Sequence, residues 1–298
     1  MIPASFQYVA PKTLQEAVKV LRRYKGEAKL LAGGHSLVPL MKLRLSTPQV
    51  VVDMRNLRPK LAYIKVDGRT VRIGALTRHA EIEHSSELKR ALPIMPAAAE
   101  HIGDMQVRNM GTIGGSLAHA DPASDWPVVA LATDATLVAY GGRTRRIPAS
   151  KFFQEPFTTA LKYYEVLTEV VIPRPPPNHG WSWKKFERKA GDYATVNAAV
   201  IVVPGNDGRI GRASIAVGAV HTRPYRATES ERMLTGKVPT MDLLRSAAEK
   251  AAELAEPTSD LRGSAEYKRE MVKVFVKRAL VEACERANLI KPQVAEVR

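Results

Sequence analysis

Cysteine is almost absent from this chain: among 298 residues the one thiol is that of Cys284. A single thiol excludes an internal disulfide, which agrees with a reducing compartment. It also cannot supply the set of thiolates that an iron–sulfur cluster or a structural zinc ion usually takes. We therefore expect no metal site in this chain.

Long apolar runs are missing as well, since no stretch approaches the roughly 20 residues needed to span a bilayer. The amino-terminal sequence MIPASFQYVAPKTLQEA has neither a basic leader nor a continuous apolar segment, so it does not resemble a secretory signal. Aromatic residues make up only 6%, but 45% of the residues are apolar, and a chain of this length can bury one large core or two ordinary ones. These features predict a folded cytoplasmic protein without a transmembrane segment.

Acidic residues are few, with 30 Asp and Glu against 45 Lys and Arg, which gives a formal charge of +15. Such an excess can bind nucleic acid through its phosphates. Here the basic residues are spread along the chain, the longest clusters being 143–146 and 184–188, and no known nucleic-acid-binding motif accompanies them. We therefore expect a basic solvated surface, or one that faces acidic partner subunits, and no binding of nucleic acid.

The first part of the chain alternates helical and strand patterns around a glycine pair. Thr13-Leu14-Gln15-Glu16 has the form of a capping box and is followed by apolar residues at helical spacing. The patterns predict a helix over 12–24, a strand over 29–32, a glycine turn at Gly33-Gly34, a helix over 37–44 and a strand over 50–53.

The next part shows the same mixture of helices and strands and ends at a proline-rich segment, residues 173–178. Proline cannot donate a backbone hydrogen bond, so this segment is the strongest candidate for a domain boundary. Strands are predicted over 63–66, 71–73, 136–140, 145–147, 165–172, 181–187, 196–203 and 212–220, and helices over 78–85, 91–101, 127–133, 241–255 and 264–287. This order indicates an α+β protein with a first domain over 1–176 and a second over 177–298.

Two glycine-rich stretches are the main candidates for a binding site. Ala32-Gly33-Gly34-His35-Ser36 and Gly111-Thr112-Ile113-Gly114-Gly115-Ser116 each combine glycines with hydroxyl side chains beside a predicted helix start. Glycine lets a ligand approach the main chain, and unpaired amides at a helix start suit a phosphate. The alternative is that each stretch is only a tight turn. Neither contains Gly-Lys-Ser/Thr or Gly-x-Gly-x-x-Gly, so the P-loop and Rossmann interpretations fail.

Four motifs in order carry a resemblance to a known family. Ala32 to Ser36, Arg108 to Ser116, Asp125 and Gly191-Asp192-Tyr193-Ala194-Thr195 together resemble the FAD-binding medium subunit of the molybdenum hydroxylases, which include carbon monoxide dehydrogenase, aldehyde oxidoreductases and xanthine dehydrogenase. The similarity extends over nearly the whole chain. It implies a vanillyl-alcohol-oxidase-type (PCMH-like) FAD-binding domain of two α+β subdomains, about 1–56 and 57–176, followed by a smaller carboxy-terminal α+β domain.

The resemblance also implies roles for single residues. The two glycine stretches would hold the FAD pyrophosphate, with His35 as a donor to a phosphate oxygen, and Asp125 would accept a hydrogen bond from a sugar or ribityl hydroxyl. A lysine would approach the isoalloxazine, Lys185 being favoured over its neighbour Lys184, together with Tyr193. Asp125 has the alternative of capping the helix that follows it, and Tyr193 that of an ordinary packed aromatic. The expected cofactor-binding residues are Ala32, Gly33, Gly34, His35, Ser36, Leu37, Gly111, Thr112, Ile113, Gly114, Gly115, Ser116, Asp125, Lys185 and Tyr193.

The implied function is electron transfer through FAD, with no catalytic residue and no metal ligand in this chain. Substrate, an aldehyde or carbon monoxide, would be oxidised at a molybdenum cofactor in a large partner subunit. Electrons would pass through 2Fe–2S clusters in a small partner subunit to the FAD and on to an external acceptor, and the resemblance allows a dimer of such heterotrimers. A free-standing FAD-dependent oxidase or reductase is the alternative within the enzymes, and a nucleotide-binding module without redox function is the alternative outside them.

Overall fold

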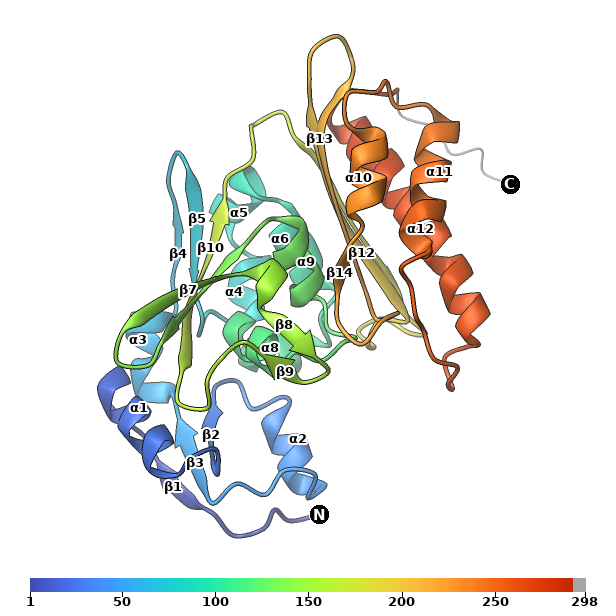
Figure 1. Ribbon diagram of the computed structural model, residues 1–298. Coiled ribbons are helices and arrows are strands. Elements are labelled where there is room, and N and C mark those ends of the chain that lie inside the picture. The colour runs from blue at the N-terminus through green and yellow to red at the C-terminus, as the bar shows by residue number, and fades with distance from the viewer. Residues whose placement is uncertain (292–298) are drawn as a thin grey trace.

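The computed structural model describes residues 1–291 and contains three main β-sheets, which follow one another along the chain (Figure 1). The last residues of the expected second domain, 292–298, lie outside the described residues. The first sheet is parallel, with strand order β1-β3-β2. Its elements are β1 (Gln7–Val9), α1 (Leu14–Arg23), β2 (Ala28–Leu31), α2 (Leu37–Lys42) and β3 (Val50–Asp53).

The second sheet is antiparallel and has the order β4-β5-β10-β6-β7. Its strands are β4 (Ile64–Val66), β5 (Thr70–Gly74), β6 (Thr136–Tyr140), β7 (Thr144–Pro148) and β10 (Val166–Pro173), and a small hairpin of β8 (Phe153–Glu155) and β9 (Thr158–Thr159) lies beside it. The helices of this part are η1 (Arg55–Leu57), α3 (Arg58–Leu61), α4 (His79–Glu83), α5 (Ser86–Ala91), α6 (Ile94–Glu100), α7 (Met105–Met110), α8 (Ile113–His119), α9 (Trp126–Ala132) and η2 (Ala149–Lys151).

The third sheet has the order β11-β12-β13-β14, and each neighbouring pair is antiparallel. One of its faces is covered by long helices of the same part of the chain, and the other packs against α6 and α9 (Figure 1). Its elements are β11 (Gly180–Phe186), β12 (Val196–Pro204), β13 (Ile210–Gly218), β14 (Tyr225–Arg226), α10 (Thr228–Leu234), α11 (Met241–Ala252) and α12 (Ala265–Arg286).

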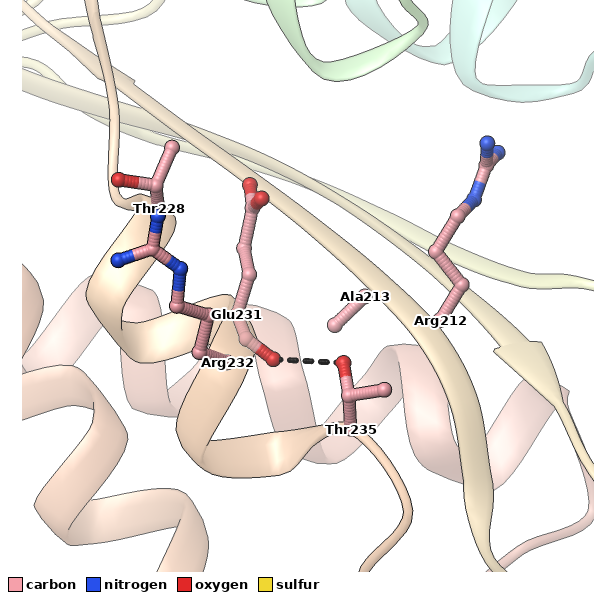
Figure 2. Close-up of a pocket in the computed structure, with 6 residues that line it drawn as sticks. All are labelled: Arg212, Ala213, Thr228, Glu231, Arg232 and Thr235. Carbon is pink, nitrogen blue, oxygen red and sulfur yellow. Dashed lines mark hydrogen bonds between the residues drawn. The ribbon is translucent and has the colours of Figure 1, made fainter.

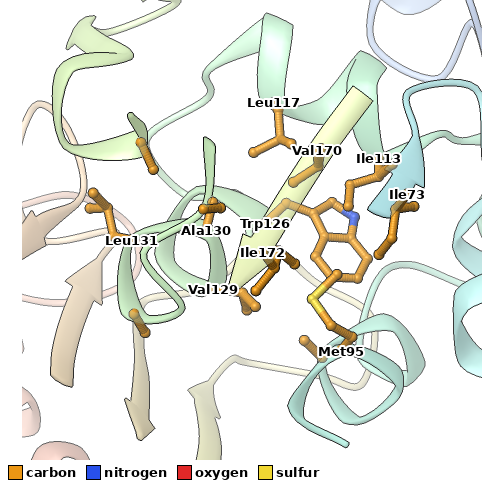
Figure 3. Packing of buried hydrophobic residues seen from close by; sticks show 14 of the residues in the cluster. Ile73, Met95, Ile113, Leu117, Trp126, Val129, Ala130, Leu131, Val170 and Ile172 are labelled. Atoms are coloured by element: carbon orange, nitrogen blue, oxygen red, sulfur yellow. The ribbon is translucent and has the colours of Figure 1, made fainter. Parts of the chain in front are cut away.

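The largest apolar core is centred on Trp126, the first residue of α9, whose side chain is among the largest fully buried ones. Figure 3 shows its indole packed among Ile73, Met95, Ile113 and Ile172. The same cluster includes residues of the third sheet, namely Trp183, Ala199, Ile201 and Ala216. Burial of an aromatic ring with its aliphatic neighbours is the main force that joins these elements. The second and third sheets therefore share one core.

The predicted elements agree well with the observed ones, and the α+β class is confirmed. The capping box at the start of α1 forms in part: the Glu16 amide donates to Thr13 Oγ1 at 3.1 Å, and the Glu16 carboxylate accepts from the Lys12 amide rather than from Thr13. The predicted helix over 91–101 is wrong at its start, because Pro93 lies at the N-cap of α6 and α5 ends at Ala91. Helices α3, α5, α7 and α10 were not predicted.

A shallow hollow lies on the third sheet beside α10, away from the glycine stretches (Figure 2). Thr235 and Glu231, two of the residues that line it, already have partners within the described chain. Thr235 Oγ1 donates to the Glu231 carbonyl oxygen at 2.8 Å, and the Glu231 carboxylate accepts from the Ile215 amide at 2.7 Å and pairs with Arg226. These bonds fix α10 to β13, so we interpret this hollow as a structural feature.

Candidate cofactor-binding cleft

A cleft of about 730 Å³ lies where the three parts of the chain meet. Its walls come from the segment after β2, from the segment around the start of α8 and from the loop after β11. All of the cofactor-binding residues expected from the sequence line it except Ile113. The side chain of Ile113 is 1% exposed and belongs to the core around Trp126, so it does not line the cleft.

The segment between β2 and α2 presents open backbone amides to the cleft. The amides of residues 33–37 have no hydrogen-bond acceptor within residues 1–291. Gly34 has a φ of +77°, a conformation that glycine adopts without strain, and this turns the chain so that successive N–H groups lie together. Ser36 is the N-cap residue of α2, and its side chain makes no capping bond. Such a concave row of donors favours an anion.

His35 behaves differently from the expectation. Its Nδ1 lies 2.9 Å from the Gly33 carbonyl oxygen. A carbonyl can only accept, so Nδ1 carries the proton and, in the neutral ring, Nε2 carries none. In this orientation a neutral His35 ring has no second N–H to donate to a phosphate oxygen.

The second glycine stretch uses most of its amides within the protein. Helix α8 begins at Ile113, so Gly114, Gly115 and Ser116 lie in its first turn rather than in a loop. The Ile113 amide donates to the Thr77 carbonyl oxygen, and the Gly114 amide to that of Ala75. The Gly115 amide donates to Thr112 Oγ1, so within residues 111–116 only the Thr112 amide lacks an acceptor in the described chain. The expectation that both stretches offer open amides is wrong for this one.

The two glycine stretches touch each other directly. A Cβ atom on Gly33 would lie 2.3 Å from the Met110 carbonyl oxygen and 2.7 Å from the Gly111 Cα atom. A Cβ on Gly114 would lie 2.5 Å from that of Ala75. These glycines are needed because backbones approach too closely for a side chain, and not because a ligand does. The contact holds the open amides of residues 33–37 beside Thr112 and Ser116.

A buried ion-pair cluster forms the side of the cleft near the third sheet. Lys185 Nζ lies 3.0 Å from Asp125 Oδ2 and 3.2 Å from Glu187 Oε2, and it donates to the His101 carbonyl oxygen at 2.9 Å. Asn197 donates to Asp125 Oδ1 at 3.1 Å. The Lys185 side chain is 2% exposed. Two carboxylates balance its charge, so Lys185 is not a free cation facing the cleft.

The structure also bears on the alternatives for these residues. Asp125 is the N-cap residue of α9, but its side chain makes no capping bond and bonds to Lys185 and Asn197 instead, so the side-chain capping role is wrong. Burial raises the pKa of Asp125, and the neighbouring Lys185 opposes this. Lys184 points to the other face of β11 and pairs with Glu282 of α12, and only Lys185 lines the cleft.

Tyr193 lies at the mouth of the cleft with 46% of its surface exposed. Its loop is fixed by Asp192, whose carboxylate bonds to Arg188 and Arg262. Gly191 has a φ of +79° and packs against the Gly103 backbone. The alternative of an ordinary packed aromatic does not describe so exposed a ring.

Among the polar side chains that line this cleft and were not predicted from the sequence is that of His79. It is 4% exposed and is the first residue of α4, separated from β5 by residues 75–78. The signal that could have found it is its place at the start of the predicted helix 78–85, just after the connection from the predicted strand 71–73, where binding residues often lie.

The fold and the cleft together define an α+β protein with a row of open backbone amides in a cleft where three parts of the chain meet. Residues 4–175 match the FAD binding domain in molybdopterin dehydrogenase, and residues 181–283 match the CO dehydrogenase flavoprotein C-terminal domain. The chain therefore belongs to the family of FAD-binding medium subunits of the molybdenum hydroxylases.

Similar proteins agree with this. The carbon monoxide dehydrogenase medium chain of Hydrogenophaga pseudoflava is 40% identical over 96% of this chain and 99% of its own length. The glyceraldehyde dehydrogenase medium chain of Sulfolobus acidocaldarius is 41% identical over 95% and 99%. The structure of the carbon monoxide dehydrogenase from Hydrogenophaga pseudoflava superimposes with a TM-score of 0.94 at 41% identity and covers 96% of this chain and 99% of that one.

Among residues 1–291 no helix is both long and apolar enough to cross a membrane. No group of three or more His, Cys, Asp and Glu side chains is placed to hold a metal ion in the same part of the chain.

We predict that Gly33→Ala weakens FAD retention and lowers the free energy of unfolding by about 1–3 kcal/mol, because the new methyl group forces the Met110 backbone away. Visible flavin absorbance of the purified protein and denaturant unfolding measure the two effects. Gly68→Ala is the matched control, since a Cβ at Gly68 meets nothing within 4 Å. Equal behaviour of the two variants would contradict the role of the loop contact.

We also predict that Lys185→Met destabilises the protein by about 3–5 kcal/mol, because it leaves two buried carboxylates without their cation. Lys184→Met, which breaks a partly exposed pair with Glu282, should cost about 1 kcal/mol or less. Denaturant unfolding of both variants measures the difference. A Lys185 variant as stable as the Lys184 variant would show that the cluster is not held by this charge.

Proposed function

We propose that this chain is the electron-transfer subunit of a heterotrimeric molybdenum hydroxylase and that its FAD lies in the cleft between the three parts. The observation that carries the proposal is the row of open amides at residues 33–37 inside that cleft. A diphosphate accepts several hydrogen bonds and carries negative charge, which is what this row is suited to bind. The apolar walls, such as Leu30, Ile102 and Leu161, suit the flat rings on either side.

Each lining residue has a proposed role toward the cofactor. The amides of residues 33–37, with the hydroxyls of Ser36 and Ser116, hold the diphosphate. Asp125 has room for a further hydrogen bond from a cofactor hydroxyl, since a carboxylate accepts more bonds than the two that Lys185 and Asn197 provide. Lys185 and Tyr193 would lie beside the flavin ring.

FAD, when bound, takes up electrons and passes them on. The chain's one thiol supports an external source for these electrons. Cys284 is 0% exposed in the core of the third part, and burial raises its pKa to about 12. A thiol that stays protonated is no cluster ligand. We therefore propose that the electrons come from 2Fe–2S clusters of a small partner subunit, and that substrate is oxidised at a molybdenum cofactor of a large one.

The substrate and setting are part of the proposal. Two relatives are named as medium chains of a carbon monoxide and a glyceraldehyde dehydrogenase, which favours carbon monoxide or an aldehyde. The lone thiol favours a reducing compartment, the cytoplasm. We further propose that the chain divides into domains 1–176 and 177–298, with the first composed of subdomains 1–56 and 57–176, since residues 174–179 carry only the connection between β10 and β11.

We predict that the protein purified from its native source brings two further chains with it, one containing molybdenum and one containing iron and sulfide. The absorbance spectrum of the complex should show both FAD and iron–sulfur clusters. Dialysis against a metal chelator that leaves the clusters intact should also leave the FAD bound. Substrate oxidation by this chain alone, purified with FAD and without partners, would instead establish the free-standing oxidase.

We predict that ADP competes with FAD for the isolated chain, because ADP carries the same diphosphate and adenosine. Riboflavin, which has no phosphate, should bind much more weakly. Fluorescence titration of the cofactor-free protein measures all three ligands. Competition by riboflavin but not by ADP would exclude the diphosphate role of residues 33–37.

A further inference from the structure

His79 is held in place by the central tryptophan of the core. Trp126 Nε1 donates to His79 Nδ1 at 3.0 Å, and the ring centroids lie 5.9 Å apart. Trp126 is itself 1% exposed and enclosed by aliphatic side chains (Figure 3). The imidazole therefore cannot rotate without breaking a buried hydrogen bond, which is costly.

This hydrogen bond determines where the proton of His79 sits. An indole N–H can only donate, so Nδ1 must be the accepting nitrogen and Nε2 carries the hydrogen. Burial lowers the pKa of His79 to about 3, and the nearby His35 and Arg108 act in the same direction. Arg108 is itself paired with Glu83 at 2.7 Å. The ring is thus a neutral Nε2–H donor throughout the physiological pH range.

The Nε2 atom lies at the junction of the two glycine stretches. A Cβ on Gly111 would be 2.7 Å from it, and Gly111 is also the residue whose Cα lies against Gly33. The His79 side chain lines the cleft, and its Nε2–H has no acceptor within the described residues 1–291. The Nε2 atom is not sealed from solvent, and because the His79 side chain lines the cleft, an anion bound there is placed to accept its hydrogen.

We propose that His79 is a further cofactor-binding residue, which donates its Nε2–H to a diphosphate oxygen of the dinucleotide in the cleft. The inference rests on the proposed FAD site. A diphosphate is favoured over a ring carbonyl because the open amides of residues 33–37 begin at Gly33, which touches the same Gly111. His79 then supplies a donation that a neutral His35 ring, with its Nδ1–H on the Gly33 carbonyl oxygen, does not.

The first test compares FAD dissociation constants of full-length variants. His79→Phe keeps a ring of similar size but removes the donor, and we expect FAD binding to weaken about ten- to hundredfold, as for loss of a hydrogen bond to a charged group. His79→Gln, which can accept from Trp126 and donate into the cleft, should recover part of this loss. His84→Gln is the control, since His84 is exposed at the end of the same helix α4 and does not line the cleft. Thermal unfolding of each cofactor-free variant separates weak binding from loss of folding.

The second test uses the wild-type chain, so it does not depend on the variants folding. Nitrogen NMR of the 15N-histidine-labelled protein should show a histidine that stays protonated on Nε2 from pH 5 to pH 8, consistent with a pKa of about 3. Its Nε2–H resonance should shift on addition of ADP and of FAD, but not of riboflavin.

These measurements can contradict the role of His79 independently of the proposed FAD site. An Nε2–H signal that moves with riboflavin and not with ADP would assign the donor to the flavin ring, and a signal that moves with neither ADP nor FAD would remove His79 from the site. A folded His79→Phe protein that binds FAD with wild-type affinity would also exclude this role of His79. If the wild-type chain takes up no FAD at all, the proposed function fails instead.

Discussion

The contact between the backbones at Gly33 and at Met110 and Gly111 is the constraint on which the cleft depends. It joins the first sheet to the helical part of the second at a distance that no side chain would permit. Because the second stretch is anchored in turn by Thr77 and Ala75 at the end of β5, the open amides of the first stretch are positioned by a sheet to which they do not belong. A binding turn is thus made rigid by a neighbour rather than by its own hydrogen bonds.

The two glycine stretches look alike in sequence, but their backbone amides have different roles. The first keeps its amides free, while the second uses them to close a helix start and to tie α8 to β5. Donors held in place before the ligand arrives lose little entropy on binding, which is the advantage of such an arrangement. Trp126 holds a side-chain donor in place in the same way, because its indole fixes the imidazole of His79 that faces the cleft.

Much of this could be predicted from the sequence. Strand and helix periodicity placed most elements within a few residues, and the glycine motifs indicated the cleft because residue type and order are local signals. The predictions that failed concern features that tertiary contacts determine. The occupied amides of Ile113 and Gly114 depend on the carbonyl oxygens of Thr77 and Ala75, which follow β5 and lie far away in the sequence. The neutralised charge of Lys185 depends on Asp125, distant in sequence and brought close by the shared core. His79 gave no motif, because its significance comes from the indole beside it.

The core shared by the second and third sheets has a consequence for how the cofactor is exchanged. Residues of the third sheet pack into the same apolar cluster as Trp126, among them Trp183, Ala199 and Ile201. Lys185 of the same sheet forms a buried ion pair with Asp125, the residue before α9. Large apolar interfaces of this kind do not open by small hinge motions. The second and third sheets therefore stay together while a dinucleotide enters or leaves on the side of Tyr193, so cofactor exchange is expected to proceed without separation of the two sheets.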